Sequence, residues 1–109
     1  MLAAPDNPAA SMTQQPFSSY ESFESEARRR GFDEVLERSW PPQTVLDTHT
    51  HSFGVWAQVS RGEMWLTVGE RTQHLLPGAQ FTLDPDVPHA ERYGADGASY
   101  WVARRNARR

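Results

Sequence analysis

The sequence predicts an all-β fold of the double-sheet jelly-roll kind, a β-barrel preceded by one short helix. Short runs rich in β-branched and aromatic residues recur at roughly ten-residue spacing after residue 31. Turn signals containing glycine, proline or acidic residues separate these runs. With 109 residues, the chain has room for one such domain.

We expect the chain to divide into a tail, a domain and a second tail. Residues 1–18 hold prolines and mostly small polar side chains, which predicts a disordered N-terminal tail. They lack the basic region and apolar run of a signal peptide. Residues 19–103 form the single domain, and residues 104–109 form a basic C-terminal tail that we expect to be solvated.

A helix is predicted over about residues 19–30. Ser18 followed three residues later by Glu21 fits a capping box. Three consecutive arginines favour a helix C-terminus, and Gly31 is a natural stop.

The barrel is predicted over about residues 32–103. "FDEVLERSW" alternates in polarity, "PPQ" turns, and "TVLDTHTH" is rich in β-branched residues. Further strands are expected at "VWAQVS", "EMWLTV", "RTQHLL", "AQFTLD" and "ASYWVAR". We place turns at Arg61–Gly62, Gly69–Glu70, Pro77–Gly78 and "PDVPH".

Charge and composition narrow the function classes. The formal charge of −3 and the pI near 5.7 do not favour a nucleic-acid surface. No cysteine is present, which excludes disulfides and thiolate metal ligands and is common in cytoplasmic proteins, the location that we expect. No apolar run approaches the ~18 residues of a membrane span.

Three histidines form a candidate metal site. His49 and His51 are two residues apart in a predicted strand, so their side chains share a face. His89 follows a turn at the start of another strand. Three imidazoles converging inside a barrel suit one divalent metal ion, Fe, Zn, Ni or Mn, and leave positions open for water or substrate. His74 is expected on the surface.

The spacing of these histidines resembles that of the cupin family. The first cupin motif, Gly-(X)5-His-X-His-(X)3,4-Glu-(X)6-Gly, falls without a gap on Gln43, His49, His51, Val55 and Gly62. The second motif, Gly-(X)5-Pro-X-Gly-(X)2-His-(X)3-Asn, falls on Gly78, Asp84, Asp86, His89 and Tyr93. The resemblance covers Phe32 to Ala103 and implies a small RmlC-like jelly roll that holds a metal through the three histidines.

The departures from the family pattern affect the predicted site. Valine at position 55 stands where the family has a metal-binding glutamate, and its side chain cannot ligate a metal. Asp47 shares the face of His49 by strand alternation, so it is a candidate fourth ligand, a hydrogen-bond partner of a histidine ring, or a solvated rim residue. Gln58 is another candidate ligand, on the opposite face unless a bulge intervenes.

Around the histidines we expect an apolar pocket wall and two polar residues. The wall residues share the parity of the histidines or lead toward His89: Phe53, Val55, Ala57, Phe81 and Leu83. Arg92 and Tyr93 follow His89 closely and are candidates to orient an anionic or polar substrate; the alternative is a solvated strand and turn. Most of the tryptophans are expected in the core or in a dimer interface.

The resemblance implies a small-molecule metalloenzyme, similar to cupin dioxygenases that lack the glutamate. The alternative is a non-catalytic module that binds a metal or small ligand for sensing. No helix-turn-helix segment is evident, and we expect neither nucleic acid nor membrane as a partner. Similar small cupins pair through their N-terminal strand, here "FDEVLERSW", so we expect a homodimer.

Overall fold

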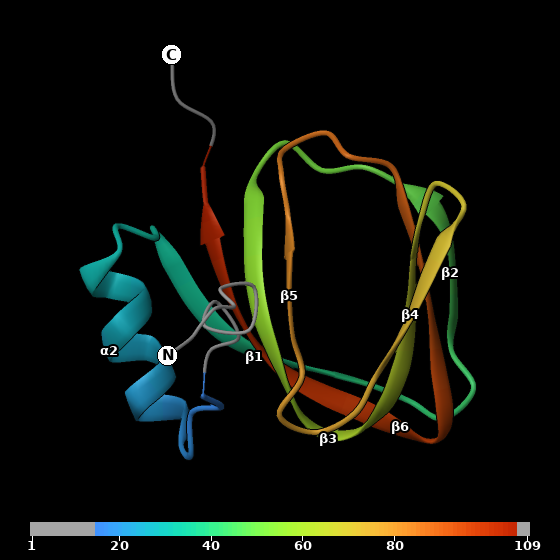
Figure 1. Cartoon of the computed structure of the whole chain (residues 1–109), viewed down its shortest axis with the longest axis horizontal. Helices are drawn as coiled ribbons and strands as arrows, with labels where there is room; N and C mark the ends of the chain where they lie inside the picture. Colours follow the sequence, from blue (N-terminus) through green and yellow to red (C-terminus); the bar gives the residue numbers. More distant parts are fainter. Residues whose placement is uncertain (1–14, 107–109) are drawn as a thin grey trace, which may run out of the picture.

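The structure, a computed structural model, describes residues 15–106 and consists of one helix and a strongly bent antiparallel sheet (Figure 1). Of the predicted tails, residues 1–14 and 107–109 lie outside the described part of the chain. The elements follow in the order α2 (Tyr20–Arg29), β1 (Glu34–Trp40), β2 (Val45–His49), β3 (Gly54–Val68), β4 (Arg71–Leu75), β5 (Gln80–Leu83) and β6 (His89–Arg105).

Two long strands build both walls of the barrel. In one wall, the first half of β3 and the second half of β6 pair with β5 and β1, in the order β1-β6-β3-β5. The remaining halves of β3 and β6 join β2 and β4 in the order β2-β6-β3-β4. The two walls face each other across the interior, as Figure 1 shows. This is the predicted jelly-roll architecture.

The turn predicted at Arg61–Gly62 is wrong, because β3 continues through it. The register between β3 and β6 shifts between Val59 and Arg61 and again between Gly62 and Met64. Such bulges bend a strand without ending it. Gly62 has a φ of +78°, and a Cβ there would lie 2.0 Å from the carbonyl oxygen of Gly97. The glycine signal therefore marks the corner where β3 passes from one wall to the other.

The helix begins one residue later than the predicted capping box. Ser19, not Ser18, is the N-cap: its Oγ accepts from the amide of Ser22 at 3.1 Å, and the Ser22 hydroxyl serves as the reciprocal partner in place of Glu21. At the other end, Gly31 follows the helix with a φ of +90°, which favours glycine. The predicted stop is confirmed.

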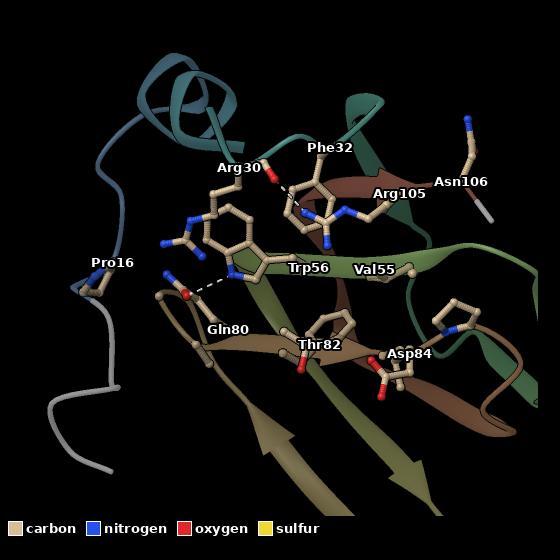
Figure 2. A pocket seen from close by; sticks show the side chains of 16 residues that line it. Pro16, Arg30, Phe32, Val55, Trp56, Gln80, Thr82, Asp84, Arg105 and Asn106 are labelled. Atoms are coloured by element: carbon tan, nitrogen blue, oxygen red, sulfur yellow. Dashed lines mark hydrogen bonds between the residues drawn. The ribbon is translucent and has the colours of Figure 1, made fainter. Parts of the chain in front are cut away.

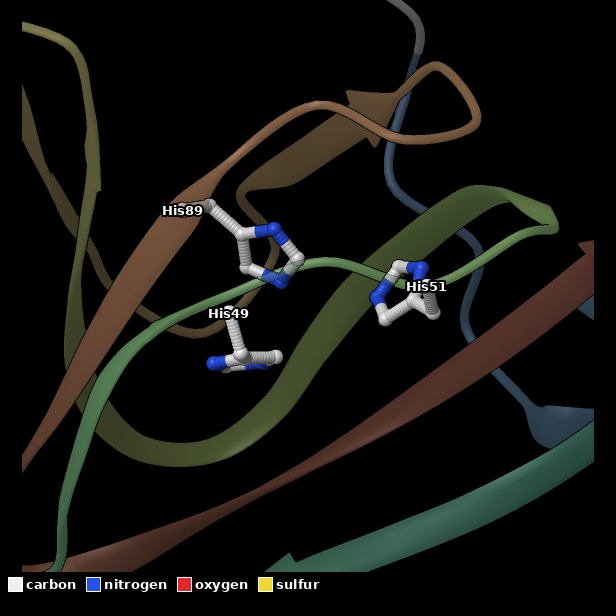
Figure 3. A group of neighbouring side chains, drawn as sticks. All are labelled: His49, His51 and His89. Carbon is white, nitrogen blue, oxygen red and sulfur yellow. The ribbon is translucent and has the colours of Figure 1, made fainter.

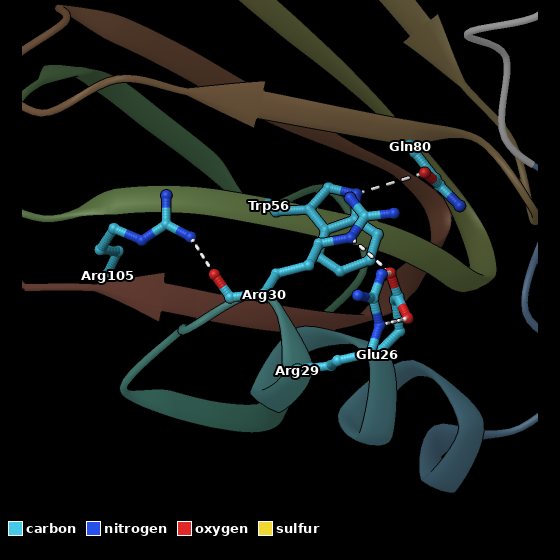
Figure 4. A network of polar contacts seen from close by, with 6 residues as sticks. All are labelled: Glu26, Arg29, Arg30, Trp56, Gln80 and Arg105. Carbon is cyan, nitrogen blue, oxygen red and sulfur yellow. Dashed lines mark hydrogen bonds and ion pairs between the residues drawn. The ribbon is translucent and has the colours of Figure 1, made fainter.

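Helix α2 packs on the outer face of the β1-β6-β3-β5 wall. Phe23 and Ala27 are fully buried against Trp56 and Ala103. Around this contact Arg30 lies 4.2 Å over the Trp56 ring, and the Trp56 indole donates to Gln80 at 3.2 Å (Figure 4). Aromatic packing and a cation–π contact thus fix the helix to the wall.

The interior of the barrel holds the main core. It contains these buried residues: Val55, Ala57, Val59, Met64, Leu66, Leu75, Phe81, Leu83, Tyr93, Ala98, Tyr100 and Val102. Odd-numbered residues of the first half of β3 face this core, and the even-numbered Trp56 faces the helix, as alternation along a strand requires. The described residues include no helix with the length and apolar character needed to span a membrane.

Candidate metal centre

The three histidines predicted as metal ligands gather at one end of the barrel interior (Figure 3). His49 ends β2, His89 begins β6 directly opposite it, and His51 lies in the loop after β2. The candidate ligand atoms of all three lie within 4.8 Å of one another. The ring of His51 stacks on Phe53 at 4.3 Å between centroids. Because His51 is beyond the strand end, the loop rather than strand alternation places its ring.

A backbone carbonyl orients each of the three rings. The Nδ1 of His49 lies 2.7 Å from the carbonyl oxygen of Asp47, and the Nδ1 of His89 lies 2.9 Å from that of Val87. The Nδ1 of His51 lies 3.3 Å from the carbonyl oxygen of Phe53. A carbonyl can only accept, so each Nδ1 carries the proton and each Nε2 presents its lone pair. Metal-binding histidines commonly have this arrangement.

The chemistry of the site fits a divalent metal. His89 is 1% exposed, and its Nε2 is buried without a hydrogen-bond partner among the described residues. A buried polar atom without a partner is costly and calls for a ligand. Burial also lowers the pKa of His51, which favours the neutral ring that a metal requires. Three imidazoles whose Nδ1 atoms lie against backbone carbonyls, leaving Nε2 as the ligand atom, form a suitable donor set.

A carboxylate that we did not predict at the site, Glu91, lies beside these nitrogens. Its Oε2 is 3.4 Å from the Nε2 of His89 and 3.8 Å from the Nε2 of His49. Its other oxygen, Oε1, accepts a hydrogen bond from the hydroxyl of Tyr93. The sequence contained a signal for this placement: Glu91 is two residues after His89 in the same strand, so both side chains point to the same face.

The residues proposed to complement the histidines lie elsewhere. Asp47 contacts His49 only through its backbone carbonyl among the described contacts, and Asp47 itself is exposed. Gln58 is buried on the helix side of β3, where it donates to the carbonyl of Phe17 and accepts from its amide, at 2.8 and 2.9 Å. No bulge turns Gln58 inward. The structure therefore does not bring Gln58 to the histidines.

An interior cavity of about 230 Å³ adjoins the metal centre. Four of the five residues predicted for the pocket wall line it: Phe53, Val55, Phe81 and Leu83. The fifth, Ala57, is fully buried in the core beyond this lining. The cavity is large enough for a small molecule of a few heavy atoms.

Arg92 and Tyr93 were predicted as candidates to orient a substrate, and the structure places Arg92 away from the histidines. Arg92 lies 4.0 Å over the ring of Trp65, in a stack that continues to His74 on the outer side of the barrel. Tyr93 points inward, is fully buried and stacks on Trp40 at 5.6 Å. Burial raises the pKa of Tyr93, helped by Tyr100 and Glu91, so its hydroxyl stays protonated and donates to Glu91.

Two arginines that were not predicted also line the cavity. Arg38 on β1 and Arg104 on β6 both point to the interior side of their wall. Arg104 pairs with Glu34 at 3.5 Å through Nη1, while its Nε is buried without a hydrogen-bond partner in the described part of the chain. The sequence signal was that Arg38 is two residues after Leu36 and Arg104 two residues after Val102, so each arginine shares a strand face with a residue that packs on the core.

A larger groove, of about 820 Å³, lies on the outside of the barrel beside α2 (Figure 2). Trp56, Gln80 and Phe32 contribute to its lining. Its arginines are engaged within the protein: Arg105 donates to the carbonyl of Arg30 at 2.7 Å and lies 4.2 Å over Phe32. The histidines lie on the other side of the sheet. The interior cavity, not this groove, holds the convergent polar groups expected of a functional site.

Comparison with known proteins agrees with this architecture. The AraC-like ligand-binding domain family matches residues 31–105. The chain belongs to this family. The domain is a small cupin, and the match begins at the glycine that ends α2 and includes every strand of the barrel.

Solved structures support the fold. An RmlC-like cupin from Shewanella frigidimarina is 20% identical with a TM-score of 0.60, covering 68% of this chain and 66% of that one. A structure from a study of DMSP lyases is 23% identical with a TM-score of 0.62, and the match covers 67% of this chain and 38% of that one. An HTH_3 family transcriptional regulator from Vibrio cholerae is 18% identical with a TM-score of 0.58, and the match covers 69% of this chain and 43% of that one. The domain thus matches less than two thirds of the length of each of these chains.

Proposed function

We propose that the domain binds one divalent metal ion through His49, His51 and His89 and acts on a small molecule, as a metalloenzyme of dioxygenase-like type. The observation that carries this proposal is the convergence of three imidazoles whose Nδ1 atoms all lie against backbone carbonyls, with the Nε2 of His89 buried and without a hydrogen-bond partner among the described residues. When bound, iron would supply redox chemistry there, and zinc, nickel or manganese would supply Lewis-acid chemistry.

The cavity favours a small anionic substrate. Arg38 and Arg104 line the same cavity as the histidines. The Nε of Arg104 is buried without a hydrogen-bond partner among the described residues, and such an N–H is suited to a carboxylate. The apolar side chains of Phe53, Phe81 and Leu83 would exclude water around the body of the ligand. A small carboxylate with one end toward the histidines and the other toward Arg104 fits this distribution of groups.

Both enzymes and regulators occur among the similar structures, and this supports a second candidate function. DMSP lyases share the fold, but so does an HTH_3 family transcriptional regulator, and the family is described as ligand-binding. A non-catalytic sensing module that holds a metal or a small ligand is therefore the alternative. In either case the expected partner is a small molecule, not nucleic acid or membrane, and the expected location is the cytoplasm.

Metal content tests the common part of both functions. Purified protein loaded with Zn²⁺ and then desalted should retain about one ion per chain. Replacing His49, His51 or His89 with alanine should abolish retention, because each removes one of three ligands. His74→Ala is the matched control, since His74 is exposed and pairs with Glu63 at 2.8 Å. Retention of zinc by His89→Ala would overturn the metal centre.

Oxygen consumption separates the enzyme from the sensor. The Fe(II)-loaded protein should consume oxygen when a panel of small thiols, diketones and carboxylates is added, and His89→Ala should not. Arg104→Gln should raise the KM for an anionic substrate more than it changes kcat. Tight binding of a panel member without turnover under any metal would favour the sensing module.

A further inference from the structure

We propose that Glu91 is the fourth protein ligand of the metal, a carboxylate supplied by β6 in place of the glutamate that the cupin pattern expects on β3. This inference rests on the proposed three-histidine centre. Position 55, where the family motif has glutamate, is valine in this chain. Glu91 occupies one of the unspecified positions between His89 and Tyr93 in the second cupin motif, so the motif spacing gives no indication that this glutamate replaces the one expected at position 55.

The position of the carboxylate fits a ligand. Its Oε2 faces the Nε2 atoms of two of the histidines, at 3.4 and 3.8 Å. Neither contact is a hydrogen bond. The Nε2 of His89 has no hydrogen-bond partner among the described residues. Donor atoms that ligate one ion must lie near one another without bonding directly, and the Oε2 of Glu91 meets this condition toward the Nε2 atoms of His49 and His89.

The second carboxylate oxygen is held in place. Oε1 accepts a hydrogen bond from Tyr93, which is fully buried and stacked on Trp40. The phenol therefore fixes the rotation of the carboxylate and leaves Oε2 toward the histidines. Ligating carboxylates are commonly hydrogen-bonded in this way, because the bond restricts the ligand to one orientation.

The burial of Glu91 also favours a nearby cation. The residue is 9% exposed, and its described contacts are two imidazoles and a phenol, none of which carries a fixed charge. A buried carboxylate without a cation is costly. A divalent ion held by the histidines would supply that cation next to Oε2.

Val55 on β3 and Glu91 on β6 face the same cavity from opposite walls, so a carboxylate on either strand enters the same space. Val55 lines the same cavity as His49, His51 and Glu91. It is 8% exposed and packs in the apolar core. The wall that carries the carboxylate in the family pattern is thus apolar here, and the opposite wall carries it instead.

Zinc affinity of Glu91→Gln is the first test. Glutamine keeps the size of the side chain and an oxygen that can accept from Tyr93, but it lacks the charge. We expect Zn²⁺ affinity, measured by competition with a chelating dye, to fall at least about tenfold, with one site retained. Glu63→Gln is the matched control: it removes a carboxylate that also contacts a histidine, His74, at 2.8 Å, but outside the cavity. Its affinity should be unchanged.

Two further measurements identify a direct bond. The absorption spectrum of the Co²⁺-loaded protein should differ between wild type and Glu91→Gln, because one oxygen donor is lost. Adding Val55→Glu to Glu91→Gln should restore affinity, since the new carboxylate enters the same cavity. Thermal melting in excess chelator shows whether each variant is folded.

The outcomes separate this inference from the proposed function. If wild type retains no zinc, the metal centre itself is wrong. If His89→Ala abolishes binding but Glu91→Gln binds as tightly as wild type, the centre stands and Glu91 is not a ligand. A loss of affinity with an unchanged Co²⁺ spectrum would show that the carboxylate acts through its charge alone, which also overturns the inference.

Discussion

At the scale of single residues, the site depends on short-range contacts that orient polar groups in an apolar interior. Each histidine of the metal centre is turned by a carbonyl two residues away in the sequence. Glu91 is turned by Tyr93, also two residues away. Local backbone geometry therefore determines which atoms face the cavity, where His89 and Glu91 are buried and His49 and His51 are partly exposed.

Tyr93→Phe should destabilise the protein by about 1.5–3 kcal/mol, the usual range for a buried hydrogen bond to a charged group. The ring and its packing on Trp40 remain, so the loss reports on the interactions of the hydroxyl: its hydrogen bond to Glu91 and its contact with Tyr100. Urea unfolding in excess chelator measures the effect without a contribution from metal binding.

Tyr20→Phe is the control for this substitution. It removes a hydrogen bond of 3.0 Å to the carbonyl of Val35, between neutral groups at the protein surface, and should cost about 0.5–1 kcal/mol. Equal effects of the two substitutions would contradict a special role for the Tyr93 hydroxyl.

At the scale of secondary-structure elements, two long bent strands make the barrel possible. Gly62 in β3 and Gly97 in β6 both have positive φ, of +78° and +72°. A Cβ at Gly62 would lie 2.0 Å from the carbonyl oxygen of Gly97, and one at Gly97 would lie 2.3 Å from that of Trp40. The backbones of neighbouring strands approach so closely at this corner that only glycine fits.

Gly62→Ala should therefore cost about 3–5 kcal/mol or prevent folding, because the added methyl group meets backbone that cannot move independently. Gly69→Ala is matched for conformation, with a φ of +61°, but nothing lies within 4 Å of its Cβ. It should cost only the left-handed strain of about 1–2 kcal/mol.

Unfolding in urea, or melting temperature where a variant is too unstable, compares the two. If Gly62→Ala loses no more stability than Gly69→Ala, the close approach of β3 and β6 is not important for the barrel.

The C-terminal turn of α2 should be sensitive to acid through Glu26. Its carboxylate accepts hydrogen bonds from Arg29 and Arg30 at 2.6 to 2.9 Å, and these contacts lower its pKa from 4.5 to about 2. A carboxylate with a lowered pKa contributes stability above its unfolded pKa of 4.5, and this contribution is lost as pH falls toward 2.

Glu26→Gln should therefore lower the melting temperature at pH 6, and the difference from wild type should shrink as the pH falls from 4.5 toward 2. Glu24→Gln, which removes a single contact of 3.5 Å to Arg28, should have a smaller effect at pH 6. A difference between wild type and Glu26→Gln that persists unchanged at pH 2 would contradict the role of these ion pairs.

At the scale of the whole molecule, the two walls have different surroundings. The β1-β6-β3-β5 wall is covered on its outside by α2 and by Phe17, which packs edge-to-face on Trp56 at 5.7 Å. The opposite wall carries on its outer face a stack of the exposed Arg92 and His74 on the half-buried Trp65. Strand β1 pairs with β6 along one edge, and its other edge has no pairing in the described part of the chain.

We expect the protein to form a homodimer through the N-terminal strand β1, because an unpaired strand edge is a favourable surface for association. Light scattering at micromolar concentration should then give a mass of about twice the 12.4 kDa of the chain. A mass of 12.4 kDa across the concentration range would show that the domain is a monomer.

The sequence by itself determined the class of fold and the three histidines. The spacing of β-branched runs and turn residues is a local property of the chain, and so is the motif spacing that selected His49, His51 and His89. The helix stop at Gly31 is likewise local, since it depends on the left-handed conformation of one residue.

Even the departures from the cupin pattern keep the backbone that glycine would provide. Gln43 and Asp86 replace motif glycines, and both have positive φ, of 62° and 66°. The conformation at these two turns is imposed by the fold around them, at a cost in strain for residues with a side chain.

Only the tertiary structure decided what surrounds the histidines. Arg92 and Gln58 were plausible by sequence distance, but strand alternation and the helix contact turn them to the outer face of the barrel. Arg38 and Arg104 line the same cavity because β1 and β6 pair across the sheet, joining residues about sixty positions apart in the sequence, such as Arg38 and Tyr100. Glu91 joins them because β6 continues into the opposite wall, where Glu91 pairs with Leu46 of β2. Such contacts depend on register and on the bends of β3 and β6, which short-range sequence patterns do not specify.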